Sequence, residues 1–348
     1  MSNVIYWHLA ITLVVAYLAT RVLVPINIRL SKRFDMIAIP NERSIHTVPT
    51  PTAGGLSFGL VIIILQLALG VLYLHNGFGS SLIKLGGISI LLMLFGLIDD
   101  KYQSRVRFKL IWQIIIAALM YFAGYKVAFL TNPVGNHFFL GWMSFPLTVF
   151  WFLLTMNAIN LIDGLDGLAS GITCIVSIVL AVVGFKSQNS LVLFLSVLLF
   201  STNIAFLKYN FFPAKIFMGD TGSLIIGLNI AAISTASSST FKGITTMTLM
   251  VPVIVMAIPI IDTVLAVFRR LGKGSIFKAD KAHLHHYMLQ LGLSQKSIAL
   301  IIYFVTFLFG LAAIGFSFSS QKILFSILVI LMSVLIISTY IFIHRGQK

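Results

Sequence analysis

Long runs of apolar residues, separated by short polar segments, follow one another along the whole chain. Most runs approach the ~20 residues that a helix needs to cross a ~30 Å hydrocarbon layer. The runs do not alternate apolar with polar positions, so they do not indicate the strands of a membrane β-barrel. The pattern predicts an all-α, polytopic membrane protein with about eleven transmembrane helices and a single domain, residues 1–348. The predicted spans are 4–24, 54–74, 84–98, 110–130, 142–162, 168–185, 190–207, 221–237, 244–267, 297–317 and 323–343.

The composition agrees with this interpretation, because 59% of the residues are hydrophobic and only 9% are charged. A soluble globular chain carries about 25% charged residues. The one cysteine, Cys174, lies inside an apolar run, which excludes a disulfide framework. The first apolar run lacks a small-residue cleavage site and many more runs follow it. We therefore interpret it as a membrane helix and not as a removed signal.

Basic residues distinguish the two membrane faces. Of the 24 Lys and Arg residues, 18 fall in every second connecting segment and in the C-terminal tail. Lys and Arg concentrate in cytoplasmic loops, so we expect the N-terminus outside and the C-terminus in the cytoplasm. The net charge of +15 follows from this bias and from a need to bind anions. Nucleic acid is not indicated, because the chain has no long basic domain outside the membrane.

Acidic residues are rare, and all nine lie in or within about two helical turns of the predicted cytoplasmic segments. They are Asp35, Glu42, Asp99, Asp100, Asp163, Asp166, Asp220, Asp262 and Asp280. A carboxylate next to hydrocarbon is unfavourable unless a cation meets it. We therefore expect the chemistry of this protein at the cytoplasmic membrane face.

Two adjacent carboxylates, Asp99 and Asp100, end the third predicted span within LIDDKY. Neighbouring side chains on a helix point about 100° apart, so these two cannot share one partner symmetrically. With the Lys/Arg-rich residues 101–109 they could position a metal–phosphate group or accept a proton from a phosphate. The alternative is an interfacial charge cluster that only ends a helix.

Residues 157–171, NAINLIDGLDGLASG, place polar side chains between two apolar runs. Asn157, Asn160 and Asp163 are three residues apart on one side of a helix end, and Asp166 follows. Amide oxygens and carboxylates are hard ligands that suit Mg²⁺ or Mn²⁺. A helix that starts near residue 168 would also offer free amides to a phosphate. The alternative is a re-entrant turn whose polar groups satisfy one another.

Residues 211–223, FFPAKIFMGDTGS, hold one acid, Asp220, at the start of a predicted span and between Gly219 and Gly222. A carboxylate with open backbone on both sides can hold a metal whose other ligands are phosphate oxygens. Phe217 offers a flat surface on which a base could stack. The alternatives are that Asp220 serves only as a helix N-cap and that Phe217 only packs.

The longest hydrophilic segment is residues 268–291, FRRLGKGSIFKADKAHLHHYMLQL. Its histidines are His283, His285 and His286. Their spacing does not fit an HExxH zinc site and no cysteine ligand accompanies them, so a zinc centre is not indicated. The imidazoles, with Arg269 and Arg270, could donate hydrogen bonds to a diphosphate. The alternative is a solvated basic loop.

Five sequence blocks, in this order, resemble those of the polyprenyl-phosphate N-acetylhexosamine-1-phosphate transferases. They are RSIHTVPTPTAGG, LIDDKY, NAINLIDGLDGLASG, FFPAKIFMGDTGSLIIG and KADKAHLHHYMLQLG. The resemblance covers roughly residues 20–295 and is highly specific. That family includes bacterial enzymes that start O-antigen, enterobacterial common antigen and teichoic acid linkage synthesis, and the phospho-MurNAc-pentapeptide translocase.

The resemblance implies an enzyme at the cytoplasmic face of the bacterial inner membrane. A phosphate oxygen of undecaprenyl phosphate attacks the β-phosphate of a UDP-N-acetylhexosamine, which gives undecaprenyl-diphospho-sugar and UMP. Mg²⁺ (or Mn²⁺) is the expected cofactor. Both substrates are phosphate anions, so a divalent cation with Arg, Lys and His side chains suits the reaction. The expected partners are the two substrates and membrane lipid, without nucleic acid, and a homodimer stays open.

For the aspartates, the resemblance implies roles residue by residue. Asp220 matches the metal ligand of the family. Asp99 and Asp100 match its paired aspartates, of which the first contacts or deprotonates the lipid phosphate. Asp163 and Asp166 match aspartates near the nucleotide and the diphosphate. These four residues, Asp99, Asp100, Asp163 and Asp166, are the catalytic candidates.

For the other candidates, the resemblance implies metal and substrate binding. Asn160 matches an asparagine that eukaryotic relatives add to the metal site. Asn210 and Phe217 match positions that contact uridine, and the phenylalanine stacks on uracil. The histidine block matches residues that grip the sugar diphosphate. The further substrate-binding candidates are His283, His285 and His286, from this match, and Asn157, Arg269 and Arg270, from their residue types and positions.

The expected sugar is GlcNAc. The phospho-MurNAc-pentapeptide translocase carries three consecutive histidines followed by Phe-Glu in its last loop, whereas this chain has HLHHYMLQLG. The first loop, NERSIHTVPTPTAGG, resembles the O-antigen-initiating branch. GalNAc, QuiNAc, FucNAc and MurNAc-pentapeptide stay open as alternatives. The product is expected to initiate O-antigen, common antigen or teichoic acid linkage.

Two other functions compete with this one. A secondary transporter would place ionisable residues near the bilayer midplane. Here the acids lie at the ends of spans, and the deepest, Asp262, is only about 8 Å from its helix end at 1.5 Å per residue. A CDP-alcohol phosphotransferase has Ala-Arg after its first Asp-Gly and further spaced aspartates, which DGLDG lacks. The transferase is therefore the preferred function.

Overall fold

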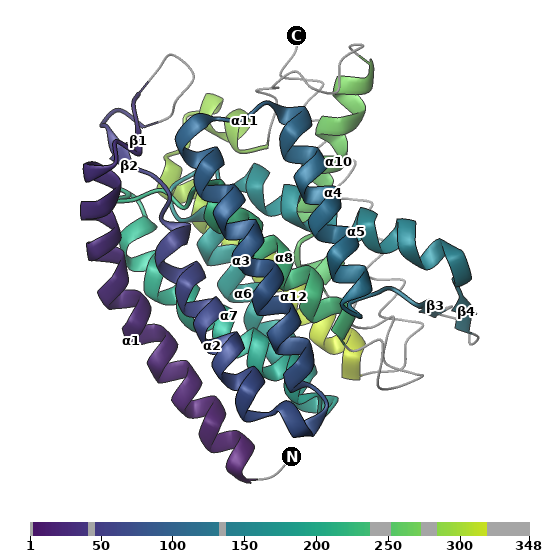
Figure 1. Cartoon of the computed structure of the whole chain (residues 1–348). Helices are drawn as coiled ribbons and strands as arrows, with labels where there is room; N and C mark the ends of the chain where they lie inside the picture. The colour runs from purple at the N-terminus through teal and green to yellow at the C-terminus, as the bar shows by residue number, and fades with distance from the viewer. Residues whose placement is uncertain (1–2, 41–45, 132–136, 237–251, 273–283, 319–348) are drawn as a thin grey trace.

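The protein is a bundle of long α-helices (Figure 1). The computed structural model describes residues 3–40, 46–131, 137–236, 252–272 and 284–318. Within these residues, seven helices are long and apolar enough to cross a membrane. The prediction of a polytopic α-helical membrane protein is thereby confirmed. The number of about eleven spans and their direction across the membrane stay predictions.

In the described residues up to Ala236, eight α-helices follow one another along the chain. They are α1 (Asn3–Arg33), α2 (Gly55–Leu72), α3 (Gly79–Tyr102), α4 (Val106–Phe122), α5 (Ser144–Ile162), α6 (Leu168–Lys186), α7 (Ser190–Asn210) and α8 (Gly219–Ala236). Later helices are α10 (Ala257–Gly272), α11 (Leu284–Gln290) and α12 (Gln295–Phe318). Of the later predicted spans, 244–267 lies partly and 323–343 wholly outside the described residues.

Two short antiparallel hairpins, which the apolar pattern does not predict, accompany the helices. β1 (Ile37–Ala38) pairs with β2 (Thr50–Pro51) beyond the end of α1. β3 (Phe129–Thr131) pairs with β4 (His137–Phe139) between α4 and α5. Short 3₁₀ turns precede α3 at Leu74–Asn76 and α5 at Gly141–Met143. The hairpins lie at the periphery of the bundle (Figure 1), so the fold remains helical.

The fourth predicted span, 110–130, extends too far at its C-terminal end. α4 stops at Phe122, and Gly124 follows it with a φ of +104°. Glycine adopts this left-handed conformation freely and commonly ends helices. The Tyr125 N–H donates to the Met120 carbonyl oxygen at 3.0 Å, and the chain then continues into β3.

α8 lies in the middle of the bundle, where it packs against α2, α3, α5 and α7. Every residue of α8 after the first two is buried. Neighbouring helices surround it instead of lipid, so its polar side chains can find partners inside the protein. Gln66 Nε2 on α2 donates to Asn229 Oδ1 of α8 at 2.6 Å. Trp151 Nε1 on α5 donates to Ser234 Oγ of α8 at 2.7 Å.

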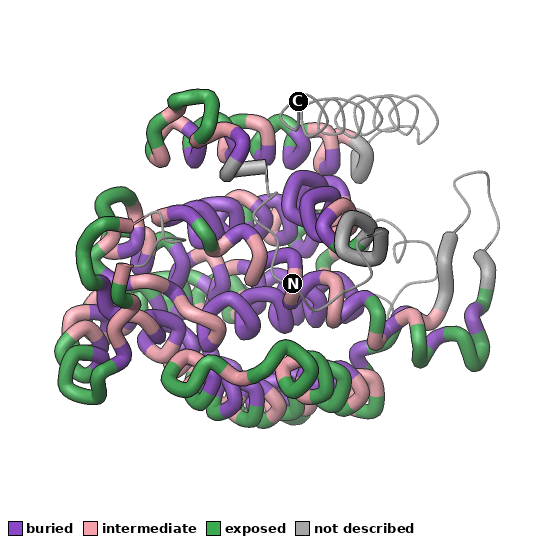
Figure 2. Tube along the Cα trace, turned by 90° about the horizontal axis from the view of Figure 1, so that it is seen from above, coloured by how far each residue is buried: buried purple, intermediate pink, exposed green. Residues whose placement is uncertain are grey.

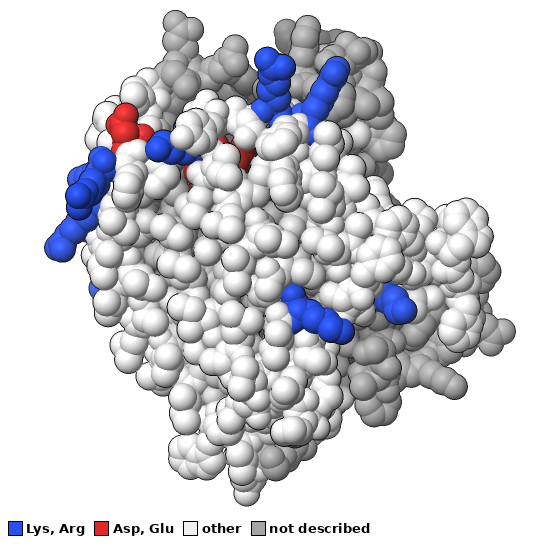
Figure 3. Space-filling view, viewed as in Figure 1, with Lys and Arg blue, Asp and Glu red and all other residues white. Residues whose placement is uncertain are grey.

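The outer surface is that of a lipid-facing protein. Buried residues fill the middle of the bundle and exposed residues lie on its outer faces (Figure 2). Many exposed side chains are large and apolar, for example Trp7 at 71% and Phe122 at 76% exposure. The acidic residues visible in Figure 3 lie near the upper edge, at the end of the molecule that carries β1, β2 and α11 in Figure 1. The acidic charge visible on this face is therefore confined to one end of the bundle.

Candidate active site

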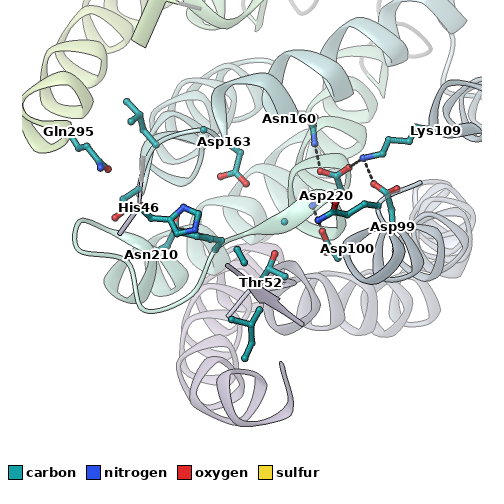
Figure 4. Close-up of a pocket in the computed structure, with 18 residues that line it drawn as sticks. His46, Thr52, Asp99, Asp100, Lys109, Asn160, Asp163, Asn210, Asp220 and Gln295 are labelled. Atoms are coloured by element: carbon teal, nitrogen blue, oxygen red, sulfur yellow. Dashed lines mark hydrogen bonds and ion pairs between the residues drawn. The ribbon is translucent and has the colours of Figure 1, made fainter. Parts of the chain in front are cut away.

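One cavity at this end of the bundle collects polar side chains from helix ends that are far apart in the sequence (Figure 4). Its volume is about 390 Å³. It is lined by the C-terminal ends of α3, α5 and α7, by the N-terminal parts of α4, α8 and α12, and by the connections before α2 and α6. The helix N-termini carry free N–H groups and the positive end of the helix dipole, which favour anions, whereas the helix C-termini favour cations.

Eight residues that the sequence analysis singled out line this cavity. They are Asp99, Asp100, Asn160, Asp163, Asp166, Asn210, Phe217 and Asp220. The structure thus places acids from distant parts of the sequence around one space, as their concentration at one membrane face predicts. Other lining residues were not singled out as candidates, among them His46, Thr52, Lys109 and Gln295.

Lys109 joins two of the carboxylates. Its Nζ lies 2.5 Å from Asp99 Oδ2 and 2.6 Å from Asp220 Oδ2. Asp99 is buried, and its other oxygen, Oδ1, accepts the Ser104 N–H at 2.9 Å where α3 has ended. A buried carboxylate is unfavourable unless it is paired. Lys109 therefore holds the end of α3 and the start of α8 together at the cavity.

Asn160 uses both hydrogens of its side-chain amide. Its Nδ2 donates to Asp220 Oδ1 at 2.8 Å and to Ser223 Oγ at 2.9 Å. Asp220 therefore has Asn160 on one carboxylate oxygen and Lys109 on the other. An asparagine amide offers two donor hydrogens and one acceptor oxygen. The Asn160 oxygen is thus the atom left to bind a cation or a substrate hydrogen.

Asp100 has different partners from its neighbour Asp99. Its carboxylate accepts the Asp220 N–H at 2.7 Å, the Thr221 N–H at 3.2 Å and the Thr221 hydroxyl at 2.5 Å. A carboxylate that accepts the first free N–H groups of a helix caps that helix. Asp100 therefore holds the start of α8, and with it Asp220, in position. The two adjacent carboxylates do not share one partner, as their positions on a helix predict.

Glycines permit this close assembly. Gly219 has a φ of +74°, and a Cβ at this position would lie 2.6 Å from the Asp100 carboxylate oxygens. Only glycine adopts this conformation freely and leaves room for the carboxylate. A Cβ on Gly55 of α2 would lie 2.0 Å from the Gly222 backbone nitrogen of α8. The starts of α2 and α8 are therefore in direct backbone contact.

Asp163 and Asp166 follow α5 and line the same cavity. Burial raises the pKa of Asp163 well above its usual value, and the carboxylates of Asp220, Asp100 and Asp166 raise it further. Burial also raises the pKa of Asp166, against the effect of a hydrogen bond that the Ala214 N–H donates at 2.9 Å. The shared cause is burial, because a poorly solvated carboxyl group favours its protonated form.

The first connecting segment, which carries the block RSIHTVPTPTAGG, forms one wall of the cavity. It is bonded to the segment before α8, because the Phe217 N–H donates to the Pro51 carbonyl oxygen and the Gly54 N–H donates to the Phe217 carbonyl oxygen, both at 2.8 Å. Two side chains of α1 donate to carbonyl oxygens of the same segment. On this wall the rings of His46 and Phe217 meet in a T-shaped contact with centroids 4.9 Å apart.

Asn210 supports the wall through bonds inside the protein. Its Nδ2 donates to the Ile216 carbonyl oxygen at 3.0 Å, and its Oδ1 accepts the Ser170 hydroxyl at 2.9 Å. These bonds tie the end of α7 to α6 and to the segment before α8. Because an amide nitrogen carries two hydrogens, one hydrogen remains for a ligand in the cavity.

Asn157 does not line this cavity. Its Nδ2 donates to Gln113 Oε1 of α4 at 2.7 Å and to the Leu153 carbonyl oxygen of its own helix at 2.8 Å. Asn157 therefore ties α4 to α5, while Asn160, almost one turn later on α5, reaches the cavity. The two asparagines of the NAIN sequence therefore differ in role: Asn157 joins two helices, and Asn160 lines the cavity.

The basic and histidine-rich candidates are placed only in part. Arg269 and Arg270 lie in α10, and His285 and His286 lie in α11, but their side chains are outside the described residues. His283 lies wholly outside the described residues. The predicted contact of these five residues with a sugar diphosphate therefore stays a prediction.

Comparisons with known protein sequences agree with this geometry. Residues 82–238 match glycosyl transferase family 4. The chain is 36% identical over 309 residues to the probable undecaprenyl-phosphate N-acetylglucosaminyl 1-phosphate transferase of Bacillus subtilis (strain 168), which covers 88% of this chain and 84% of that protein. The chain belongs to this family of membrane transferases.

Two further relatives are similar to the chain over most of their length. The decaprenyl-phosphate N-acetylglucosaminephosphotransferase of Mycobacterium leprae (strain TN) is 36% identical over 303 residues, 79% of this chain and 75% of that protein. The phospho-N-acetylmuramoyl-pentapeptide-transferase of Caldicellulosiruptor bescii is 32% identical over 327 residues, 88% of this chain and 96% of that protein. The resemblance stated from the sequence blocks is therefore confirmed, and the protein is a polyprenyl-phosphate sugar-1-phosphate transferase.

The cavity of this transferase suits a divalent cation. Five carboxylates line it, whereas Lys109 is the one Lys or Arg side chain among its described lining residues. Burial and, after it, the carboxylates of Asp220, Asp100 and Asp166 raise the pKa of Asp163, so a cation here would stabilise its charged form. Carboxylate and amide oxygens are the ligands that Mg²⁺ accepts, with phosphate oxygens in the remaining positions. Within the described residues no three His, Cys, Asp or Glu side chains form a complete ligand set, so substrate oxygens would have to complete it.

Two residues of the transferase site were not among the candidates from sequence. Lys109 lies ten positions after Asp99 in a stretch with several other cations, and nothing in the sequence distinguishes it from them. His46 belongs to the block RSIHTVPTPTAGG, which carried part of the resemblance without any assigned chemistry. Their importance depends on the contacts between α3, α4 and α8 and between the first connecting segment and Phe217, which only the fold provides.

Proposed function

We propose that the protein transfers N-acetylglucosamine-1-phosphate from UDP-GlcNAc to undecaprenyl phosphate. An oxygen of the lipid phosphate forms a bond to the β-phosphorus, the bond between that phosphorus and the oxygen bridging to the α-phosphate breaks, and UMP leaves. The products are undecaprenyl-diphospho-GlcNAc and UMP. The relatives named for undecaprenyl- or decaprenyl-phosphate and N-acetylglucosamine support this choice of acceptor and sugar.

One observation carries the proposal: Asp99, Asp163 and Asp220 line a single cavity, although they come from three different helix ends, those of α3, α5 and α8. Transfer between two phosphate anions needs positive charge and positioning more than covalent chemistry by the protein. The cavity offers helix N-termini, the Lys109 ammonium group and a set of cation-binding oxygens at one end. It offers His46 and Asn210 at the other end (Figure 4), with Phe217 in contact with His46, and these side chains suit a nucleoside.

The residues at the charged end have separable roles in the proposal. Asp220 with the Asn160 oxygen would hold Mg²⁺, which when bound neutralises phosphate oxygens and polarises the reacting phosphorus. Asp99 would contact the lipid phosphate and take up its proton if it arrives protonated. Lys109 would keep Asp99 and Asp220 in place and add positive charge for the phosphates. Asp100 would position α8.

The residues at the other end would bind the donor. Phe217 would stack on uracil, and Asn210 would contribute its remaining amide hydrogen. Asp163 and Asp166 would lie between the nucleotide and the diphosphate. The predicted contacts of the sugar diphosphate with Arg269, Arg270, His283, His285 and His286 complete the proposal.

The same proposal places the cavity at the cytoplasmic face of the bacterial inner membrane. The distribution of Lys and Arg supports it, because the cavity lies at the end of the bundle where the predicted cytoplasmic segments meet. A nucleotide sugar is available on that side. The product would initiate O-antigen, common antigen or teichoic acid linkage synthesis. A different UDP-sugar donor would react by the same chemistry. The proposal is also compatible with a homodimer.

Purified full-length protein in detergent tests the proposal. With Mg²⁺, undecaprenyl phosphate and UDP-GlcNAc, it is expected to release UMP and to form an equal amount of lipid-linked GlcNAc. Parallel reactions with UDP-GalNAc, UDP-QuiNAc, UDP-FucNAc and UDP-MurNAc-pentapeptide establish the preferred sugar. UMP release with another UDP-sugar and none with UDP-GlcNAc would show that the other UDP-sugar is the donor. Absence of release with all five would overturn the function.

A further inference from the structure

We propose that His46 is a nucleotide-binding residue of this site, and that its ring nitrogen Nε2 forms a hydrogen bond with the uridine nucleotide part of the donor. This inference rests on the proposed function. The sequence comparison gives His46 no role, and the evidence lies in the placement of its ring.

The first observation is that the Nε2 atom of His46 is buried and has no hydrogen-bond partner among the described residues. Polar atoms in protein interiors almost always have a partner, so each exception calls for one that is supplied from elsewhere. His46 lines the cavity, and Figure 4 shows its ring among the side chains that face this space. A ligand in the cavity is therefore in position to supply the partner.

The second observation is that His46 is held against the aromatic wall. Its ring packs on Phe217 in a T-shaped contact, which fixes the ring plane. The backbone that follows His46 is bonded to Phe217 on both sides, through the Pro51 carbonyl oxygen and the Gly54 N–H. The two rings therefore belong to one rigid wall, and a base that contacts one of them lies next to the other.

The positions of the side chains and the apolar surface next to Asp99 and Lys109 favour the nucleotide over the lipid as the ligand of His46. In Figure 4, His46 and Asn210 lie on the opposite side of the view from Asp99 and Lys109. The exposed apolar side chains Ile98, at 52%, and Phe108, at 48%, adjoin Asp99 and Lys109 in sequence. A prenyl chain requires such lipid-facing surface, so the lipid phosphate belongs at that end. The end with His46 is left for the nucleotide.

Two variants distinguish the contribution of the His46 ring from that of its Nε2 atom. His46→Phe keeps an aromatic ring against Phe217 but removes Nε2, and His46→Ala removes both. His75→Ala is the matched control, because His75 is exposed and lies in the turn between α2 and α3, away from the cavity. The measurements are the KM for UDP-GlcNAc, the KM for undecaprenyl phosphate and the Kd for UMP by equilibrium dialysis. Thermal unfolding of each variant shows that it is folded.

The inference predicts that His46→Phe and His46→Ala both raise the KM for UDP-GlcNAc and the Kd for UMP about tenfold or more, the usual effect of losing one hydrogen bond to a charged or buried group. The KM for undecaprenyl phosphate stays within about twofold, and His75→Ala behaves as wild type. Unchanged nucleotide binding in a folded His46→Phe, or a rise confined to undecaprenyl phosphate, would overturn the inference. If the wild-type protein releases no UMP from any UDP-sugar, the proposed function fails, while the UMP binding comparison still tests His46.

Discussion

The ammonium group of Lys109 lies between the carboxylates of Asp99 and Asp220, 2.5 Å from the first and 2.6 Å from the second. These residues come from α4, α3 and α8, so one cation holds three helices at the cavity. Because Asp99 is buried, loss of the cation leaves a carboxylate that water does not reach. The ammonium group of Lys109 also places positive charge in the cavity where the phosphates would react.

Lys109→Met is therefore expected to reduce the rate of UMP release by about 10²–10³-fold, the usual effect of removing one electrostatic group from an active site. It is also expected to lower the temperature of thermal unfolding. Lys101→Met is the control, since Lys101 is exposed at the same end of the bundle and its ammonium group lies over the Tyr102 ring. Equal activity of the two variants would refute the role of Lys109.

The two asparagines of α5 give a second matched pair. Asn160→Ala removes the donor to Asp220 and to Ser223, so UMP release is expected to fall about 100-fold. Asn157→Ala removes the bond to Gln113 instead, so the free energy of unfolding falls by about 1 kcal/mol while activity stays within about threefold. Steady-state kinetics and thermal unfolding of both variants check this. A greater loss of activity in Asn157→Ala would restore the substrate-binding role predicted for it from sequence.

Two glycines test whether the start of α8 must approach Asp100 closely. Gly219→Ala places a Cβ 2.6 Å from the Asp100 carboxylate at a φ of +74°, so the variant is expected to lose about 1–2 kcal/mol of stability and nearly all activity. In α3, an added Cβ on Gly87 meets no atom within 4 Å. Gly87→Ala is therefore expected to keep its activity and to gain a few tenths of a kcal/mol or more from helix propensity. Wild-type activity of Gly219→Ala would show that the contact with Asp100 is dispensable.

The raised pKa of Asp163 predicts how stability depends on pH. Burial and three neighbouring carboxylates favour the protonated form in the folded protein. The unfolded value is about 4, so this group costs stability progressively as pH rises from about 4 towards the folded pKa. Asp163→Asn removes that cost. In EDTA the variant should unfold at a higher temperature than wild type at about pH 8, with the difference disappearing near pH 4, and it should be inactive.

Thermal unfolding at a series of pH values checks this prediction. A variant that is less stable than wild type at about pH 8 would mean that Asp163 is held by favourable contacts rather than crowded by other carboxylates. Added Mg²⁺ should reduce the difference in unfolding temperature between Asp163→Asn and wild type, because a bound cation stabilises the wild-type carboxylate.

The sequence predicts the helices well where the apolar runs are bounded by polar residues. The span 168–185 coincides with α6 (Leu168–Lys186) to within one residue. The span 110–130 overshoots α4, because its apolar residues continue beyond Gly124 into β3, and hydropathy does not register the positive φ of that glycine. The hairpins are not predicted, because strands of only two or three residues are too short to produce a recognisable hydrophobic pattern.

Only some residues of the site can be predicted from the sequence. The carboxylates are detectable because an acid in so apolar a chain is rare, and the clustering of Asp99, Asp163 and Asp220 follows from their places at helix ends. Lys109 and His46 are not detectable in this way. Lys109 is one of four cations in residues 101–109, and which one reaches Asp220 depends on how α4 packs against α3. His46 becomes relevant only because its segment is bonded to Phe217.

The most direct test of the central claim, that these helix ends form one cation-dependent phosphate site around Asp220, is the binding of Mn²⁺ measured by electron paramagnetic resonance. Wild-type protein is expected to bind one Mn²⁺ per chain, which Mg²⁺ displaces, and UMP is expected to tighten this binding. Asp220→Asn is expected to weaken the Mn²⁺ affinity about 100-fold or more, with UMP release lost in parallel. Equal Mn²⁺ affinity in Asp220→Asn and wild type, or UMP release that persists in excess EDTA, would contradict the account.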